Sequence, residues 1–264
     1  MTTSRPHTIG AGRIVVLVAA LVGTLVLVAP AATLLIHNDY AGMGQAVAQT
    51  AAGPLPTSLV SAAVALVGCV AVGTPLAYWL ARTRSAGWRR LVEAVLYVPL
   101  LMPPLVVGLV LIYLLGPLTP LGQFAARLGI GNVNSLFALI LASFYEAVPY
   151  YVFAAVAAFE RSDRLLERTA ESWGRPPAAV FRRVTLPAAA PGLAVGVAMA
   201  WARAIGAFGA AIIVAYHPTG LPVDIYTQLE ELGLPAAFPV ALILLVAALP
   251  LPLAVRAVWR DAPA

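Results

Sequence analysis

Few side chains in this chain of 264 residues could act as catalysts or bind a metal ion. All sixteen basic residues are arginine, so the chain lacks the lysine that a Walker-type phosphate loop or a Schiff base requires. The histidines, His7, His37 and His217, lie at or beyond the ends of apolar segments, and no serine–histidine pair, HExxH motif or aspartate pair lies within one. Cys69, the single cysteine, is interpreted as a small buried side chain. We therefore expect no catalytic residue and no metal site, which disfavours an integral membrane enzyme.

Charge is concentrated instead in residues 160–190, where the pattern predicts an amphipathic helix. Acidic and basic residues follow the favourable i, i+4 order in the pairs Glu160–Arg164 and Glu171–Arg175. An apolar edge of the same helix is expected to pack on the rest of the protein, because its members share one helical face: Phe159, Leu166, Ala170 and Trp173.

Glycine and proline then divide this segment into two short helices. Gly174 suits the left-handed position that ends a helix, while Pro176 and Pro177 prevent that helix from continuing, although proline can begin a new one. The second helix, residues 178–184, is expected to stop at the Leu186–Pro187 pair before the next apolar segment.

The second short helix carries Phe181 beside Arg182 and Arg183. An exposed aromatic residue flanked by arginines is typical of a protein–protein contact. A simpler interpretation is that the arginines only hold the loop on one side of a membrane. That interpretation explains the charge but not the glycine, the paired prolines or the alternating apolar residues. We therefore predict that residues 160–190 bind another protein.

Two further charges, Glu146 and Arg203, stand deep within apolar segments. A charge at such depth is costly in lipid, so each must face the protein interior, a partner or water. Two interpretations stay open. One is a buried Glu146–Arg203 ion pair, and the other is an Arg203 side chain that lines a pathway for anions.

The elements that must position these residues are membrane helices. The chain is 61% hydrophobic and only 10% charged, whereas a soluble domain carries about a quarter of charged residues. Apolar runs of about 20 residues cross the hydrocarbon core as helices. We predict an all-α integral membrane protein, a single domain over residues 1–264, with six spans at about 14–36, 57–81, 91–115, 135–159, 191–216 and 235–255.

Arginine placement orients these spans. Fourteen of the sixteen arginines lie in the two termini or in the connections after the second and fourth spans, whereas Arg127 lies on the other side and Arg203 inside a span. The positive-inside rule then predicts that both termini and the 160–190 loop are cytoplasmic. The same clustering beside apolar segments explains the pI of 9.7 without nucleic-acid binding. For the first span, a cleaved signal peptide is an alternative to a retained helix.

Prolines interrupt the third predicted span in the run "YVPLLMPPLVVG". Pro99, Pro103 and Pro104 each remove a backbone donor and crowd the preceding turn, which predicts a kinked helix. The kink serves either packing or a pathway beside it, and both interpretations stay open.

The stretch "GRPPAAVFRRVTLPAAAPGL", residues 174–193, resembles the EAA loop of ABC importer permeases. In that family the loop inserts a coupling helix into a cleft of a separate ATPase. The resemblance implies that a dimeric ATPase partner uses ATP and Mg²⁺, and that this chain binds no cofactor itself. It also implies a set of ATPase-coupling residues: Glu167, Arg168, Ala170, Glu171, Gly174, Arg175, Pro176, Pro177, Phe181, Arg182, Arg183, Leu186 and Pro187.

The chain departs from the family pattern at one place. The positions of the family's Glu-Ala-Ala motif hold Arg168, Thr169 and Ala170, with glutamates at Glu167 and Glu171 instead. Either a neighbouring glutamate takes over the acidic contact, or the ATPase presents an altered surface.

A second resemblance concerns the substrate. The runs "GTPLAYWLARTR" and "YVPLLMPPLVVG" resemble the molybdate, tungstate and sulfate branch, and residues 200–245 resemble the last two helices of molybdate/tungstate permeases, except that Ala207 replaces an acidic residue. The resemblance implies an inner-membrane importer of molybdate or tungstate, working as a homodimer with an external oxyanion-binding protein. Alternatives are sulfate or another small solute, and a gradient-driven secondary transporter, which a single deep carboxylate disfavours.

Overall fold

The computed structural model describes residues 11–129 and 131–259, and within them every regular element is helical. This agrees with the predicted all-α class. In chain order the elements are α1 (Ala11–Ile36), α2 (Met43–Ala51), α3 (Pro54–Arg82), α4 (Ala86–Leu101), α5 (Pro104–Leu115), α6 (Pro120–Arg127), α7 (Leu136–Arg161), α8 (Arg164–Ser172), α9 (Pro177–Val180), the π-helix η1 (Phe181–Thr185), α10 (Leu186–Ile205), α11 (Ala211–Val214), α12 (Leu221–Leu232), α13 (Leu234–Ala248) and α14 (Pro250–Trp259).

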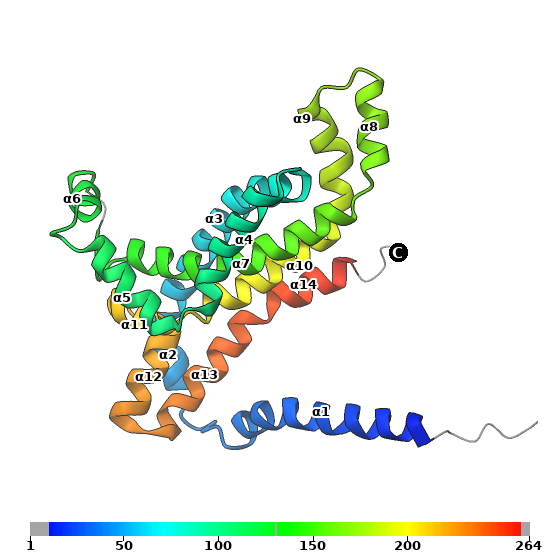
Figure 1. Cartoon of the computed structure of the whole chain (residues 1–264). Helices are drawn as coiled ribbons and strands as arrows, with labels where there is room; N and C mark the ends of the chain where they lie inside the picture. Colours follow the sequence, from blue (N-terminus) through cyan, green and yellow to red (C-terminus); the bar gives the residue numbers. More distant parts are fainter. Residues whose placement is uncertain (1–10, 130, 260–264) are drawn as a thin grey trace, which may run out of the picture.

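Five helical stretches are long and apolar enough to cross a membrane, and a bent pair, α4 with α5, would make a sixth. The five are Gly12–Ile36, Pro54–Arg82, Leu136–Arg161, Pro177–Ile205 and Leu234–Val258. In Figure 1 the start of α1, the end of α14 and the α8–α9 projection lie toward one side of the molecule, and α6 and α12 toward the other. This arrangement matches the predicted topology, although Arg5 and Arg260 lie outside the described residues.

The core consists of α3, α7 and α10, which pack together along small side chains. Gly73 on α3 lies so close to α7 that an added Cβ would approach the Tyr151 ring to 2.7 Å. Gly192 on α10 is equally close to Ala158, where an added Cβ would lie 2.5 Å from the Ala158 Cβ. Small residues allow this approach because membrane helices associate through close packing rather than the hydrophobic effect.

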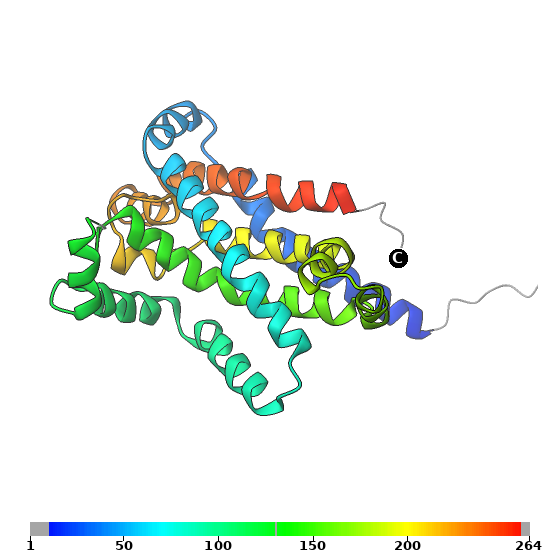
Figure 2. The same ribbon diagram turned by 90° about the horizontal axis from the view of Figure 1, so that it is seen from above.

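The third predicted span is broken rather than kinked. Helix α4 ends at Leu101, α5 begins at Pro104, and their axes differ by 108°. Pro103 and Pro104 together remove two adjacent backbone donors, which ends α4, and Pro104 then starts α5. Pro99 stays inside α4. In Figure 2, α4 lies at the edge of the molecule, beyond the end of α3. It packs on α7 there, with the ring centroids of Tyr97 and Phe153 4.9 Å apart.

The fifth predicted span, 191–216, has wrong boundaries at both ends. The helix begins at Pro177 and ends at Ile205, so residues up to Tyr216 form a loop and the short α11. Glycines explain the early end: Gly206 caps α10, and an added Cβ at Gly209 would lie 2.5 Å from Pro104. The loop thereby seats α11 against α5 in a second apolar cluster.

Helix α1 stands apart from the rest of the chain. It lies below the bundle in Figure 1, and the apolar window that qualifies it as a span contains no buried residue. Its contacts are made mainly with α13. This helix therefore offers an apolar surface to lipid or to another protein along its whole length.

Candidate functional site

The 160–190 segment folds as a hairpin of helices that projects from the bundle (Figure 1). Asp163 caps α8, accepting a hydrogen bond from the Leu165 backbone at 2.7 Å. Gly174 ends it in the left-handed conformation, with φ of 77°. Its amide bonds to the Glu171 carbonyl, and the Arg175 amide to the Ala170 carbonyl, which is a Schellman motif. The predicted helix end at Gly174 is confirmed.

The sequence predicted that the second helix of the hairpin stops at Leu186–Pro187, but in the structure it continues. Pro177 begins α9, which continues through η1 into α10 as a helical stretch of 29 residues. At η1 the Leu186 amide reaches back five residues to the Phe181 carbonyl. This wider turn accommodates Pro187, whose ring would otherwise crowd a regular helix. The tip of the projection is therefore continuous with a core helix.

Glu167 is the buried acidic residue of the projection, at 8% exposure. Its carboxylate accepts hydrogen bonds from Arg82 Nε, at 3.1 Å, and from Thr185 Oγ1, at 2.8 Å. A second contact joins Arg82 Nη2 to the other carboxylate oxygen, so the guanidinium binds it in a fork. The carboxylate at position 167 therefore faces its own chain and not an outside partner.

Arg82, the last residue of α3, also holds the end of α7. Nη1 donates to the Phe159 carbonyl at 2.9 Å, and Nη2 donates to Ser162 Oγ at 2.7 Å. The guanidinium lies over the Tyr78 ring, 5.6 Å from its centroid. In the sequence, Arg82 stood out only as one of the arginines that follow the second predicted span. The available signal was its place directly at the end of an apolar span, beside the predicted docking loop.

The predicted apolar edge is confirmed only in part, because Phe159 is buried and Ala170 partly covered, whereas Leu166 and Trp173 are exposed. Phe181 is half-buried, with its ring centroid 4.9 Å from that of Tyr78. The exposed apolar side chains are instead Leu165, Leu166 and Trp173, and Trp173 is 83% exposed. Periodicity predicted the amphipathic helix α8 correctly. The face of α8 that turns toward the protein is the one that carries Glu167, because this carboxylate binds Arg82.

The predicted ion pair between Glu160 and Arg164 is also absent. Glu160 bonds instead to Arg89 of α4 at 2.7 Å, and Arg164 donates to the Ala81 carbonyl. Among the described residues, Glu171 and Arg175 form no ion pair either, and both are exposed. The charges of the projection thus connect it to α3 and α4 rather than stabilising α8 internally.

The remaining predicted coupling residues lie mostly on the outer surface. Arg182 and Arg183 are exposed and, with Pro176, Ala178 and Ala179, line a hollow of about 460 Å³ on the projection. Arg168, Pro177 and Pro187 are exposed as well, whereas Ala170 and Leu186 are partly covered. The projection therefore presents a basic and apolar surface.

Glu146 and Arg203 do meet. Arg203 Nη2 lies 2.6 Å from Glu146 Oε2, with the glutamate side chain 2% exposed and the arginine 30% exposed. The contact has ion-pair distance without hydrogen-bond alignment. Arg203 compensates a carboxylate that would otherwise be buried alone, while part of its guanidinium stays accessible. The two interpretations left open by the sequence are thus compatible.

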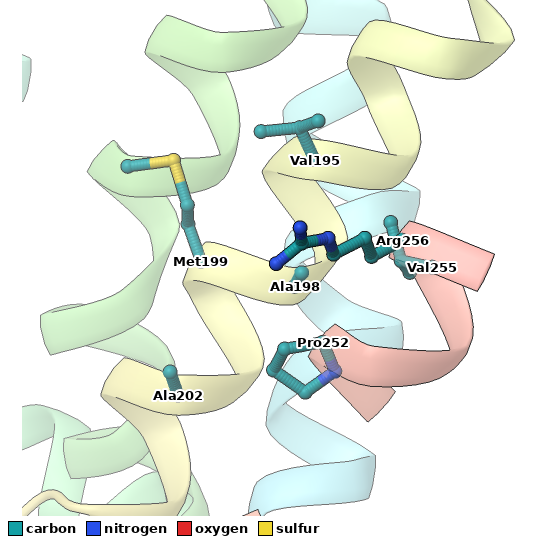
Figure 3. Close-up of a pocket in the computed structure, with 7 residues that line it drawn as sticks. All are labelled: Val195, Ala198, Met199, Ala202, Pro252, Val255 and Arg256. Carbon is teal, nitrogen blue, oxygen red and sulfur yellow. The ribbon is translucent and has the colours of Figure 1, made fainter. Parts of the chain in front are cut away.

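A groove of about 570 Å³ between α10 and α14 lies outside the predicted site. Figure 3 shows Arg256 reaching from α14 across this groove toward α10. The other lining residues are apolar: Val195, Ala198, Met199, Ala202, Pro252 and Val255. With one cation and apolar walls, the groove offers no set of donors that could enclose a tetrahedral anion.

Comparison with known protein families gives one model that covers most of the chain. Residues 73–261 match the model described as "Binding-protein-dependent transport system inner membrane component". The matched range begins in the middle of α3 and includes the projection, Glu146 and Arg203.

Individual relatives carry related names. A probable molybdenum ABC transporter permease of Haloferax volcanii is 45% identical over 187 residues, which are 71% of this chain and 68% of that protein. A molybdate/tungstate transport system permease of Pyrococcus abyssi is 32% identical over 191 residues, 72% of this chain and 71% of that protein. A sulfate transport system permease of Salmonella typhimurium is 30% identical over 196 residues, 73% and 70% of the two chains.

Solved structures share the fold at low identity. A bacterial alginate ABC transporter in complex with a periplasmic protein has a chain that aligns with a TM-score of 0.70 and 17% identity, covering 94% of this chain and 95% of that one. The methionine ABC transporter MetNI gives a TM-score of 0.62 and 19% identity over 79% of this chain and 94% of that one.

Proposed function

This chain belongs to the family of binding-protein-dependent transport system inner membrane components, and we propose that it imports molybdate or tungstate as the permease subunit of an ATP-driven transporter. The observation that carries the proposal is a projecting helix pair continuous with a core membrane helix, in a chain whose relatives are named as molybdenum and molybdate/tungstate permeases. Such a projection suits a subunit that receives mechanical work from outside the membrane.

The partner that supplies this work is an ATPase. The chain has no lysine with which to build a phosphate loop, so ATP and Mg²⁺ would be bound by the partner. The surface offered to that partner consists of Leu165, Leu166 and Trp173 with Arg182 and Arg183, all of which are exposed. Aromatic and arginine side chains dominate the energy of many protein interfaces. Glu167, being buried, would act on the projection from inside.

A second copy of the chain would complete the pathway. Helix α1 buries nothing in its apolar window, and α4 exposes Leu91, Val95 and Leu101, so one protomer leaves much apolar surface uncovered. A symmetric homodimer presents the same surface twice and closes on itself. An external oxyanion-binding protein would deliver the substrate to the side that carries α6 and α12. The complex would reside in the inner membrane, surrounded by lipid.

Arg203 is the proposed contact for the passing anion. Its guanidinium is partly accessible, because Glu146 contacts it through Nη2 and leaves part of the group exposed. A cation already balanced in this way can attract an oxyanion without holding it tightly, which transport requires because the ion must also leave.

Uptake by sealed vesicles tests the proposal. Vesicles that contain this chain, its ATPase and its binding protein should accumulate labelled molybdate when ATP is supplied, and unlabelled tungstate should compete at lower concentration than sulfate. Sulfate is the second candidate because a sulfate permease is 30% identical. Competition by sulfate at the lowest concentration would assign the chain to sulfate. Accumulation of a different solute, with no oxyanion uptake, would refute the substrate class.

A further inference from the structure

The junction between the projection and the bundle holds a fully engaged arginine. Arg82 is shared by three elements: its own α3, the end of α7 through Phe159 and Ser162, and α8 through Glu167. Thr185, which lies directly before α10, adds a fourth element, because its hydroxyl donates to the same Glu167 carboxylate. We call Arg82, Ser162, Glu167 and Thr185 the arginine junction. It joins the end of α7, which enters the projection, and the start of α10, which leaves it, to α3, which does neither.

Covalent connection alone would not fix α8. A two-residue turn at Ser162–Asp163 links it to α7, and the Gly174–Pro176 turn links it to α9. Helix α3 has no direct chain connection to the projection, since 81 residues lie between Arg82 and Arg164. Helix α3 is joined to the projection by the arginine junction, by the contact from Arg164 to the Ala81 carbonyl and by the packing of Phe181 on Tyr78. Of these, only the first two reach α8.

The geometry requires arginine at this position. Four acceptors surround the guanidinium: both Glu167 oxygens, the Phe159 carbonyl and the Ser162 hydroxyl. A planar fork with five donors can satisfy them together, whereas a lysine ammonium cannot copy the bidentate contact. Because Glu167 is buried, removal of the guanidinium would leave its charge uncompensated.

We infer that Arg82 is a positioning residue that passes movement of the projection to α3. This inference rests on the proposed function, in which an ATPase displaces the projection. It separates two tasks: the exposed surface around Trp173 binds the ATPase, and the arginine junction transmits the displacement. Helix α3 then carries the movement along its packed faces with α7 and α10, and into α4, which starts four residues after Arg82.

The test compares Arg82→Gln and Arg82→Lys with Arg84→Gln as the matched control. Arg84 lies in the same connection but is exposed, so the control removes equal charge without touching the arginine junction. In vesicles with all partners, Arg82→Gln should keep the ATPase bound but lower the anions imported per ATP hydrolysed by about tenfold or more, which is within the usual range of coupling between two sites. Arg82→Lys should lower the ratio less, and Arg84→Gln should leave it unchanged. An unchanged ratio in Arg82→Gln would overturn the inference.

A distance measurement separates failure of this inference from failure of the proposed substrate. Spin labels at Ser85 and Ser172, both exposed, report how the end of α3 lies relative to α8, after Cys69 is replaced by alanine. In the wild-type complex the distance should stay narrow with and without ATP, and in Arg82→Gln it should broaden or shift when ATP is added. This readout needs no transported anion. A distribution as narrow in Arg82→Gln as in wild type, in both states, would overturn the role of Arg82 even if molybdate uptake proves correct.

Discussion

Trp173→Ala should weaken binding of the ATPase subunit without destabilising the permease. The ring is 83% exposed, so the folded protomer gains little from it. Docking that covers about 150 Å² of its apolar surface would contribute up to about 4 kcal/mol at about 25 cal/mol per Å². Ordering of the interface offsets part of this, and alanine substitutions at central aromatic residues often cost about 2 kcal/mol. We therefore expect Kd to rise about thirtyfold.

The assay is a titration of labelled ATPase subunit onto permease held in lipid nanodiscs. Phe181→Ala is the matched control, because it also removes an aromatic ring from the projection, but one that packs inward on Tyr78 and Phe159. This control should lower the melting temperature of the permease and change Kd less than Trp173→Ala does. Wild-type Kd for Trp173→Ala, together with lost binding by a still-folded Phe181→Ala protein, would refute the assignment of the docking face.

Three further predictions follow from other sites. Arg203→Gln should leave Glu146 buried without its counter-charge and lower the free energy of unfolding by about 3 kcal/mol. The double variant with Glu146→Gln should regain most of the wild-type melting temperature but not anion uptake. Full uptake by the double variant would show that Arg203 does not line the pathway. Gly174→Ala places a side chain at φ of 77° and should lower the stability of the helix end by about 1 kcal/mol. Amide hydrogens of residues 164–175 should then exchange faster, and unchanged exchange there would argue against the helix cap. Burial raises the pKa of Asp224 above 3.8, although a hydrogen bond with Gln228 partly lowers it. The folded protein therefore binds this proton more tightly than the unfolded chain does, and its stability should fall as pH rises from about 4 through the raised pKa. Asp224→Asn should flatten that part of the plot of melting temperature against pH, and an unaltered plot would contradict this prediction.

Local chemistry explains what the sequence predicted well. The end of α8 follows from the backbone freedom of Gly174, and the new helix at Pro177 follows from the fixed φ of proline, so both are visible in a few letters. The membrane class follows from composition alone. These features depend on residues that are neighbours along the chain.

Features set by distant contacts were predicted poorly. The inward face of α8 is decided by Arg82, which lies 85 residues from Glu167. Nothing in the periodicity of residues 160–175 distinguishes a face that meets such a partner from one that meets solvent. The same holds for Phe181, which turns inward because Tyr78 and Phe159 form a place for its ring.

The boundaries of the third and fifth spans show a related limit. Hydropathy runs smoothly through Pro103–Pro104 and through residues 206–216, so an apolar window includes them in spans. In the structure, α5 turns sharply to pack on α11, and both Gly108 and Gly209 permit that approach. A break that is stabilised by tertiary packing cannot be located from hydropathy.

The energy source of uptake tests the central claim most directly. In vesicles that contain this chain, the ATPase and the oxyanion-binding protein, labelled molybdate should accumulate only when ATP is available to the ATPase, and should do so with the proton and sodium gradients collapsed. Trp173→Ala should abolish most of this uptake. Molybdate accumulation that follows an ion gradient and continues without ATP would contradict the account.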